Sequence, residues 1–368
     1  MKPHALVIGG GVAGLSTAWT LLQRGYAVTV LERGALGGES SWAGGGILFP
    51  LLPWDYEDAV TALALRSIAS YDTWLAPIEA AAGREAEFWR CGMLVVDTAR
   101  RDDATKWCTS HGLGAETRCP EHLPLEKALC TRDPLWLPEV AQLRNPRLLA
   151  ALRSAVELRG GAVREQTPAT AMHHEGSRVT GVDTPAGELG CDLLVLATGA
   201  WSGLDIAGLG VVPGIRPIRG QMVLFKLAPG VLDTIIYRNG LYLIPRRDGH
   251  VLVGSTLEDV GFDKRLDDTT CERLHAEAAA LLPQLAHEQP SRRWAGLRPG
   301  APGNLPVIDR HPDFENVFVN TGHFRYGVTM APASSELLAD LIEGTAPALD
   351  PTPYAWQAAL ERRWPEQP

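Results

Sequence analysis

Three glycines and one glutamate near the start of the chain have the spacing of a dinucleotide-binding motif. The glycines follow the pattern Gly9-x-Gly11-x-x-Gly14, and Glu32 comes 18 residues after the last of them. In such a motif the first glycine makes a tight turn, the second lets the backbone approach a pyrophosphate, and the third lets a helix pack closely on a strand. The carboxylate accepts hydrogen bonds from a ribose diol and repels a 2′-phosphate. The pattern therefore predicts a bound dinucleotide.

The elements that must position these residues can be read around them. An apolar run at 5–8 predicts a strand, apolar side chains at helical spacing over 14–24 predict a helix, and a second apolar run at 28–31 ends at Glu32. The start of that helix offers unpaired N–H groups and a positive dipole end to the phosphates. A glycine-rich turn alone would be weak support, and here the flanking strand, helix and second strand accompany it.

The order of the remaining elements predicts an α/β fold. We expect helices at about 56–82, 146–159, 267–282 and 331–343, and strands at 92–97, 162–164, 221–227, 241–244, 251–253 and 317–319. The length of 368 residues favours two domains. We predict a discontinuous Rossmann-like domain formed by 1–85, 148–214 and 305–368, with an inserted β-rich substrate-binding domain formed by 86–147 and 215–304.

The number of glycine fingerprints bears on the identity of the dinucleotide. A flavoprotein that also uses a nicotinamide cofactor usually carries a second fingerprint, but the candidate at 208–214 has a misplaced proline and no helix pattern after it. We therefore expect one dinucleotide, and FAD can serve as both cofactor and electron carrier.

Charge, composition and missing motifs exclude several classes of partner and enzyme. The formal charge of −9 and the lack of a basic tract argue against nucleic acid and anionic membrane surfaces. No run of about 18 apolar residues predicts a membrane span. The cysteines show neither Cys-x-x-Cys nor zinc spacing, so we interpret all six as reduced thiols of a cytoplasmic protein: Cys91, Cys108, Cys119, Cys130, Cys191 and Cys271. Motifs of zinc proteases, serine hydrolases and P-loop NTPases are missing.

Several segments together resemble the D-amino-acid oxidase family of FAD-dependent oxidoreductases. They are residues 9–32, the loop Ser-Ser-Trp-Ala-Gly-Gly-Gly at 40–46, and Ala-Thr-Gly-Ala-Trp-Ser at 197–202. Within the family, Leu-Tyr-Leu-Ile-Pro-Arg at 241–246, Gly-Leu-Arg-Pro-Gly at 296–300 and Thr-Gly-His-Phe-Arg-Tyr-Gly at 321–327 are similar to the glycine oxidase branch of thiamine biosynthesis. The resemblance extends from residue 5 to about 343.

The resemblance implies a set of residues that bind FAD without a covalent link, since no cysteine lies in 296–330. The set is Gly9, Gly11, Val12, Ala13, Gly14, Glu32, Arg33, Ser40, Ser41, Ala43, Gly44, Gly45, Val163, Thr198, Gly199, Trp201, Gly322, His323, Phe324, Arg325, Tyr326 and Gly327.

The resemblance also implies three catalytic, substrate-binding residues, Tyr242, Arg298 and Arg325. Arginine offers a bidentate fork to a carboxylate and a phenol adds one donor. Arg298 could instead form a surface ion pair, but its setting between Gly296 and Gly300 is read as a turn anchored by Trp294. Tyr242 by pattern alone fits a strand core equally well, and Arg325 would bind the carboxylate or cover the pocket.

Two further residues of the expected pocket, His323 and Tyr326, have less specific roles. His323 is interpreted as a hydrogen-bonded structural residue rather than a general base. Tyr326 departs from the small polar residue that this branch often has, which leaves the pocket wall and the substrate size open.

The activity implied is oxidation of glycine, sarcosine or a small D-amino acid by hydride transfer to flavin N5, giving the oxo acid, ammonia and, with O2, hydrogen peroxide. A homo-oligomer, specifically a homotetramer, is expected at the family level. The alternatives are a D-amino-acid or D-proline dehydrogenase, a sarcosine oxidase, a flavin-dependent tRNA-modifying enzyme and a non-catalytic dinucleotide sensor. The missing basic patch argues against tRNA, and a carboxylate clamp argues against a sensor.

Overall fold

A six-stranded sheet carries the N-terminal strand of the protein. The computed structural model describes residues 2–50, 52–98, 100–120 and 134–365. The sheet is parallel except for its edge strand β18, which pairs antiparallel with β19. In spatial order its strands are β18 (Val307–Arg310), β19 (Val317–Thr321), β12 (Leu193–Leu196), β1 (His4–Ile8), β2 (Ala27–Leu31) and β8 (Ala162–Arg164).

Both faces of this sheet are covered, which explains the continuous apolar runs in its strands. In β1, Ala5 and Val7 belong to the core beneath the helices, while Leu6 and Ile8 belong to the core on the opposite face. The helices that pack together on the first face are α1 (Val12–Gln23), α3 (Asp58–Ala82), α6 (Asn145–Leu158) and α8 (Gly327–Glu343). A small antiparallel sheet contributes to the second core through β9 (Ala171–Glu175), β10 (Arg178–Thr184) and β11 (Gly187–Gly190).

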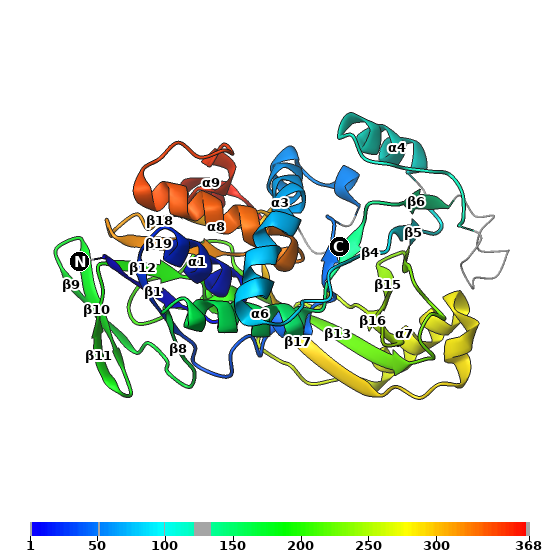
Figure 1. The fold of residues 1–368 in the computed structure, drawn as a ribbon, viewed down its shortest axis with the longest axis horizontal. Helices are drawn as coiled ribbons and strands as arrows, with labels where there is room; N and C mark the ends of the chain where they lie inside the picture. Colours follow the sequence, from blue (N-terminus) through cyan, green and yellow to red (C-terminus); the bar gives the residue numbers. More distant parts are fainter. Residues whose placement is uncertain (1, 51, 99, 121–133, 366–368) are drawn as a thin grey trace.

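A seven-stranded sheet occupies the other side of the molecule (Figure 1). Helix α7 (Asp268–Leu281) packs on it through Leu274 and Leu281, which share a core with Val223 and Leu243. The strands in spatial order are β17 (Arg292–Gly300), β13 (Arg216–Lys226), β16 (His250–Gly254), β15 (Leu241–Pro245), β14 (Ile235–Arg238), β5 (Met93–Val95) and β6 (Leu135–Leu137). Strands from 86–147 and from 215–304 thus share one sheet.

Short elements complete the chain. A three-stranded sheet joins β3 (Ile47–Leu48), β7 (Ala141–Gln142) and β4 (Trp89–Arg90). The short helices are α2 (Ser40–Ala43), α4 (Arg101–Ser110) and α9 (Trp356–Glu361), and 3-10 turns include residues 53–55 and 199–201. Among the described residues, no helix combines the length and apolarity needed to cross a bilayer.

Most expected elements are confirmed to within two residues, including α3, α6 and α7. Helix α8 begins at Gly327, four residues before the expected start, because its first turn, Gly-Val-Thr-Met, has no helical apolar pattern. No helix follows 208–214, as expected; the chain continues into β13.

The expectation that all cysteines are reduced is wrong for Cys119, which is disulfide-bonded. Cys91, Cys108, Cys191 and Cys271 are free, and Cys130 lies outside the described residues. Sequence spacing did not indicate the disulfide because bonding depends on which Cα atoms approach within about 7 Å in the fold.

Candidate active site

The glycine loop joins β1 to α1 with the geometry that its spacing predicts. Gly9 has φ +113°, and a Cβ there would lie 2.3 Å from the carbonyl oxygen of Ala197. A Cβ on Gly14 would lie 1.9 Å from the carbonyl oxygen of Gly9, so that the start of α1 packs directly on the turn. These approaches leave no room for side chains, as a close-fitting phosphate-binding turn requires.

One hydroxyl group and one carboxylate group hold the loop in place. The Ser41 hydroxyl accepts a hydrogen bond from the N–H of Val12 at 2.9 Å, at the start of α1. The Glu32 carboxylate, at the end of β2, accepts from the N–H of Gly10 at 2.9 Å and from that of Gly34 at 2.8 Å. Glu32 therefore shapes the turn as well as lining the space beside it.

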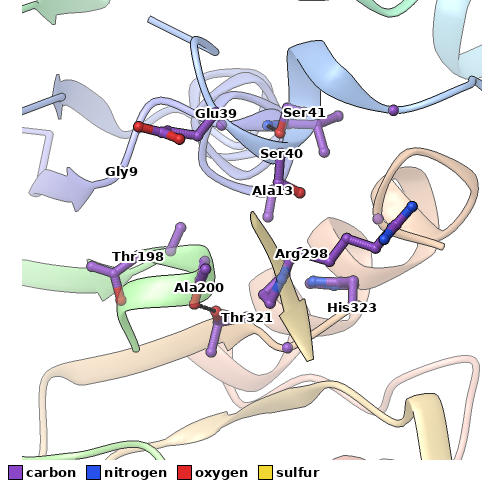
Figure 2. A pocket seen from close by; sticks show the side chains of 18 of the residues that line it. Gly9, Ala13, Glu39, Ser40, Ser41, Thr198, Ala200, Arg298, Thr321 and His323 are labelled. Atoms are coloured by element: carbon purple, nitrogen blue, oxygen red, sulfur yellow. Dashed lines mark hydrogen bonds between the residues drawn. The ribbon is translucent and has the colours of Figure 1, made fainter. Parts of the chain in front are cut away.

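One cavity of about 360 Å³ extends from this loop to β17 (Figure 2). Figure 2 shows Ala13, Ser40 and Ser41 on one wall and Thr198 and Ala200 on another, with Arg298 and His323 to the right of Thr198 and Ala200 in the view. The cavity brings together Gly9, Gly11, Val12, Ala13, Glu32, Arg33, Ser40, Ser41, Gly44, Gly45, Thr198, Gly199, Trp201, Tyr242, Arg298, Gly322, His323, Phe324, Arg325, Tyr326 and Gly327.

Three predicted cofactor residues are not among those lining the cavity. Gly14 lies under the turn. Ala43 is buried in α2, and its carbonyl oxygen accepts a hydrogen bond from the Trp294 indole N–H at 3.1 Å. Val163 lies in β8, the edge strand of the six-stranded sheet, and pairs with Val30 of β2. Gly14 and Ala43 instead position the walls.

Arg298 lies within β17 rather than in a turn, so the expected turn is wrong. Flanking glycines and Pro299 favour a turn by composition, but β17 is an edge strand, where a missing N–H is tolerated. The guanidinium donates from Nη1 to the carbonyl oxygen of Thr256 at 2.9 Å and from Nη2 to the hydroxyl of Ser255 at 2.6 Å. No ion pair in the described part of the chain involves Arg298, so the expected alternative of a surface ion pair is wrong as well.

The protonation of Arg298 is set by its surroundings. Burial lowers its pKa, and the Arg325 guanidinium lowers it further, while Tyr242 and Glu258 act in the opposite direction. The Tyr242 side chain hydrogen-bonds to Arg298, and its hydroxyl also lies 3.5 Å from the sulfur of Met222. The arrangement presents to the cavity a partly buried cation held by neutral acceptors, which suits an anionic ligand.

Arg325 lies in the turn after β19, among aromatic side chains. Burial would lower its pKa, but the hydroxyls of Tyr326, Tyr56, Tyr242 and Tyr237 together raise it. Tyr56 packs edge-on against Tyr326, with ring centroids 5.5 Å apart. Tyr326 is buried and forms part of the cavity wall, which narrows the space next to Arg325.

His323 faces the same cavity with its Nε2 buried and without a hydrogen-bond partner among the described residues. The expected hydrogen-bonded structural role is therefore not seen at Nε2. Burial lowers the pKa of His323 to about 4, so the imidazole is neutral at pH 7 and a weak base. An unpartnered polar atom in a cavity points to a ligand that completes it.

These features fit a dinucleotide that extends from Glu32 to Arg298. The glycine turn provides the cradle, the start of α1 provides N–H groups and a positive dipole end for phosphates, and His323 offers a free ring nitrogen. No group of three or more metal-ligating side chains occurs within the described residues.

Sequence reasoning missed several residues that build the site. Thr167, Pro168, Ala169, Ile206 and Asn320 line the cavity. Gly220 on β13 makes room for Arg298, since a Cβ there would lie 2.1 Å from Nη1. A glycine inside a strand pattern signals close approach of another group, and that signal was available at Gly220.

The fold and the cavity define a dinucleotide-binding oxidoreductase with a cationic end for a small anionic substrate. A family model described as "DAO: FAD dependent oxidoreductase" matches residues 4–341. The chain belongs to this family, and it is an FAD-dependent enzyme. The expected resemblance, fold class and cofactor are confirmed.

Relatives and solved structures match over nearly the whole chain. Glycine oxidase of Pseudomonas aeruginosa is 42% identical over 96% of this chain and 99% of its own length, and that of Pseudomonas putida is 40% identical over 98% and 100%. The crystal structure of glycine oxidase from Geobacillus kaustophilus superposes with a TM-score of 0.87 at 26% identity, covering 96% of this chain and 99% of that one.

Proposed function

We propose that this protein is a glycine oxidase that oxidises glycine, sarcosine and small D-amino acids with O2 and water, giving the oxo acid, hydrogen peroxide and the free amine, which is ammonia for the primary amino acids and methylamine for sarcosine. The observation that carries the proposal is Arg298, a partly buried guanidinium with neutral acceptors and no carboxylate partner among the described residues, in the cavity that also holds the dinucleotide motif. Relatives that match over nearly their whole length are glycine oxidases.

The chain's own residues would bind and orient the substrate. Arg298 and Tyr242 would hold the carboxylate, and Arg325 would add a second positive charge at the same end of the cavity. Bound FAD would accept the hydride from the α-carbon and pass the electrons to O2. Orientation by the clamp is the protein's main contribution, because no acid–base pair is needed when the substrate amine is neutral.

His323 would take no part in proton abstraction. Its low pKa makes it a weak base at neutral pH, and its free Nε2 would instead hydrogen-bond to the bound cofactor or substrate. Buried Tyr326 and its neighbour Tyr56 would keep water from the substrate end of the cavity.

We also propose the division into a FAD-binding domain (1–85, 148–214 and 305–368) and a substrate-binding domain (86–147 and 215–304). Support comes from the two sheets, since β5 and β6, from the first segment of the substrate-binding domain, lie in the same sheet as strands β13 through β17 from the second segment.

A role in forming the thiazole of thiamine is supported by relatives named "Bifunctional protein ThiO/ThiG", at 30% identity over about half of their length. A homotetramer and a cytoplasmic location stay predictions, and the Cys119 disulfide removes the support that reduced cysteines lent to the location.

The test is a substrate panel with the FAD-loaded protein. Glycine, sarcosine, D-alanine and D-proline are supplied in turn, and oxygen uptake, peroxide and dye reduction are measured. The proposal predicts peroxide from glycine and sarcosine. Dye reduction without oxygen uptake would support a dehydrogenase, and FAD-loaded protein that yields neither peroxide nor reduced dye with any of the four substrates would remove the proposed function.

A further inference from the structure

The segment that follows β16 supplies both acceptors of the Arg298 guanidinium. Ser255 and Thr256 come directly after Gly254, the last residue of β16, and they accept from Nη2 and Nη1. One of these acceptors is the backbone carbonyl of Thr256, so the position of Arg298 depends on how that peptide unit is oriented. What holds residues 255–258 in place therefore also holds Arg298.

Thr256 is fixed through its side chain. Its hydroxyl accepts a hydrogen bond from the N–H of Gln221 at 3.0 Å, on the neighbouring strand β13, and it also hydrogen-bonds to the Glu258 carboxylate. Thr256 and Gln221 are both buried. A buried hydroxyl that both accepts and donates has no freedom to rotate, and the adjoining carbonyl is fixed with it.

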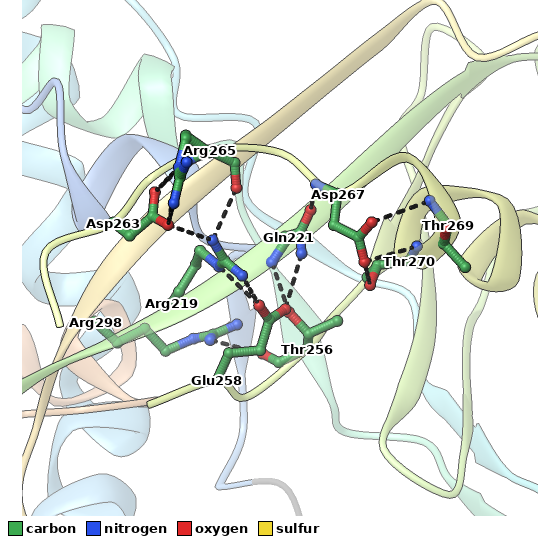
Figure 3. A network of polar contacts seen from close by, with 10 residues as sticks. All are labelled: Arg219, Gln221, Thr256, Glu258, Asp263, Arg265, Asp267, Thr269, Thr270 and Arg298. Carbon is green, nitrogen blue, oxygen red and sulfur yellow. Dashed lines mark hydrogen bonds and ion pairs between the residues drawn. The ribbon is translucent and has the colours of Figure 1, made fainter. Parts of the chain in front are cut away.

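Glu258 is the centre of this network (Figure 3). Its carboxylate accepts from the Arg219 Nε at 2.7 Å and from the Gln221 amide at 2.9 Å, in addition to the Thr256 hydroxyl. The backbones of Arg219 and Glu258 also pair in both directions, at 2.9 and 3.0 Å. Figure 3 shows the side chains of Arg219, Gln221 and Thr256 converging on Glu258, with Arg298 beside them.

We propose that Glu258 is a positioning residue for substrate binding, which fixes Arg298 through Thr256 in the geometry that receives the substrate carboxylate. The proposal rests on the proposed role of Arg298. Glu258 does not line the cavity, so it acts through Thr256 rather than by contact with the ligand. The negative charge of Glu258 contributes to this role, because it stabilises the positive charge of the Arg298 guanidinium, which burial disfavours.

The charges around Glu258 are consistent with this role. Hydrogen bonds from Thr256, Gln221 and Arg219 outweigh the effect of burial and lower the pKa of Glu258, so the carboxylate stays ionised at neutral pH. The same carboxylate raises the pKa of Arg298 against the effect of burial. Arg219 is nine-tenths buried and is ion-paired with Glu258 and, at 3.7 Å, with Asp263.

The test measures binding of acetate, a bare carboxylate, to the FAD-loaded protein by perturbation of the flavin absorption, alongside KM and kcat for glycine. We expect Glu258→Gln and Thr256→Val each to raise the acetate Kd and the glycine KM about tenfold, as loss of a charge-assisted contact does. Saturating glycine should restore kcat to within about twofold, because the reacting atoms are unchanged.

Two variants serve as controls. Thr256→Ser keeps the hydroxyl and should bind acetate within about twofold of wild type. Glu272→Gln makes the same chemical change at an exposed position of α7 and should leave the acetate Kd and the glycine KM unchanged. The double variant Glu258→Gln/Thr256→Val should be little weaker than either single one, because both changes break one pathway.

The outcomes distinguish failure of this proposal from failure of the proposed function. Unchanged acetate Kd in both Glu258→Gln and Thr256→Val overturns it, as does a loss that Thr256→Ser shares with Thr256→Val. A fall in melting temperature with unchanged Kd would show a purely structural network and also overturns it. If Glu258→Gln does not retain FAD, the comparison of Thr256→Val with Thr256→Ser decides alone. Wild-type protein that binds acetate but does not oxidise glycine removes the proposed function without deciding this one.

Discussion

Gly220 on β13 lies so close to the Arg298 guanidinium that a Cβ at position 220 would come 2.1 Å from Nη1. The two residues belong to paired strands, and Gly220 is paired in register with Gly296. The clash would be with the mobile end of a long side chain, so the fold could accommodate it while the guanidinium moved.

Replacing Gly220 with alanine should therefore impair substrate binding more than stability. We expect the glycine KM to rise about 10- to 100-fold, because a displacement of about 1 Å at a binding group can cost up to 100-fold. The melting temperature and FAD content should change little. Gly190→Ala is a matched control, since its Cβ would meet ordinary contacts at 3.6 Å. A normal KM in Gly220→Ala would mean that Arg298 does not act from its observed position.

Removal of the cation itself gives a stronger effect. Arg298→Ala should raise the glycine KM at least about 100-fold, equivalent to ~3 kcal/mol for a lost charged contact, with FAD retained. Arg298→Lys should fall between alanine and wild type because lysine lacks the bidentate fork. Steady-state kinetics with flavin content measured by absorbance check both, and an unchanged KM in the alanine variant would remove Arg298 from the site.

The third glycine of the loop should be needed for the fold around the cofactor. A Cβ at Gly14 would meet the carbonyl oxygen of Gly9 at 1.9 Å, where backbone must shift, so Gly14→Ala should cost ~1–3 kcal/mol and release FAD. At Gly11 the nearest atom would be the Ser41 hydroxyl at 3.1 Å, so Gly11→Ala should weaken FAD binding with less loss of stability. Urea unfolding and FAD titration distinguish the two; equal stability losses would contradict the assignment.

Neutral His323 should make stability depend on pH in acid. Its pKa is about 4 in the folded protein, below its ordinary value of 6.5, so the unfolded chain binds the extra proton first. The stabilisation is complete above pH 6.5 and is lost as pH falls towards 4, by up to ~3 kcal/mol. Unfolding free energies of FAD-loaded wild type and His323→Gln at pH 7 and pH 5 provide the check. Identical pH dependence in the two proteins would show that His323 is not buried in its neutral form.

Tyr326 should limit substrate size. It is buried against Tyr56 in the cavity wall, so Tyr326→Ala opens space beside Arg325. We expect kcat/KM for D-proline relative to glycine to rise about tenfold, in the range that one or two extra methylenes contribute in an apolar pocket. A ratio that stays constant would place the size limit elsewhere.

Local patterns were sufficient to predict the dinucleotide half of the site. Gly9, Gly11, Gly14 and Glu32 lie within one strand–helix–strand unit, where spacing along the chain determines spacing in the fold. The resemblance supplied Tyr242, Arg298 and Arg325, which three separate segments contribute. The helices were predicted well because their apolar periodicity extends over several turns.

The support of Arg298 could not be predicted in the same way. Gly220 and Thr256 come close to Arg298, and Glu258 is linked to it through Thr256, only because β13 pairs with β17 on one side and β16 on the other. Strand register cannot be read from local sequence. The same limit applies to Arg325, whose guanidinium lies 3.4 Å from the hydroxyl of Tyr56, far away in the chain. Glycines and prolines around Arg298 also favoured a turn where the structure has an edge strand.

The most direct test of the central claim is the stoichiometry of glycine oxidation by the purified FAD-loaded protein. Oxygen uptake, hydrogen peroxide, ammonia and glyoxylate are measured together at several glycine concentrations, with Arg298→Ala in parallel. We predict equal amounts of all four in wild type, and in Arg298→Ala the same products only at much higher glycine concentration. Wild-type protein that binds FAD but consumes no oxygen with glycine, or an Arg298→Ala variant with an unchanged glycine KM, would contradict it.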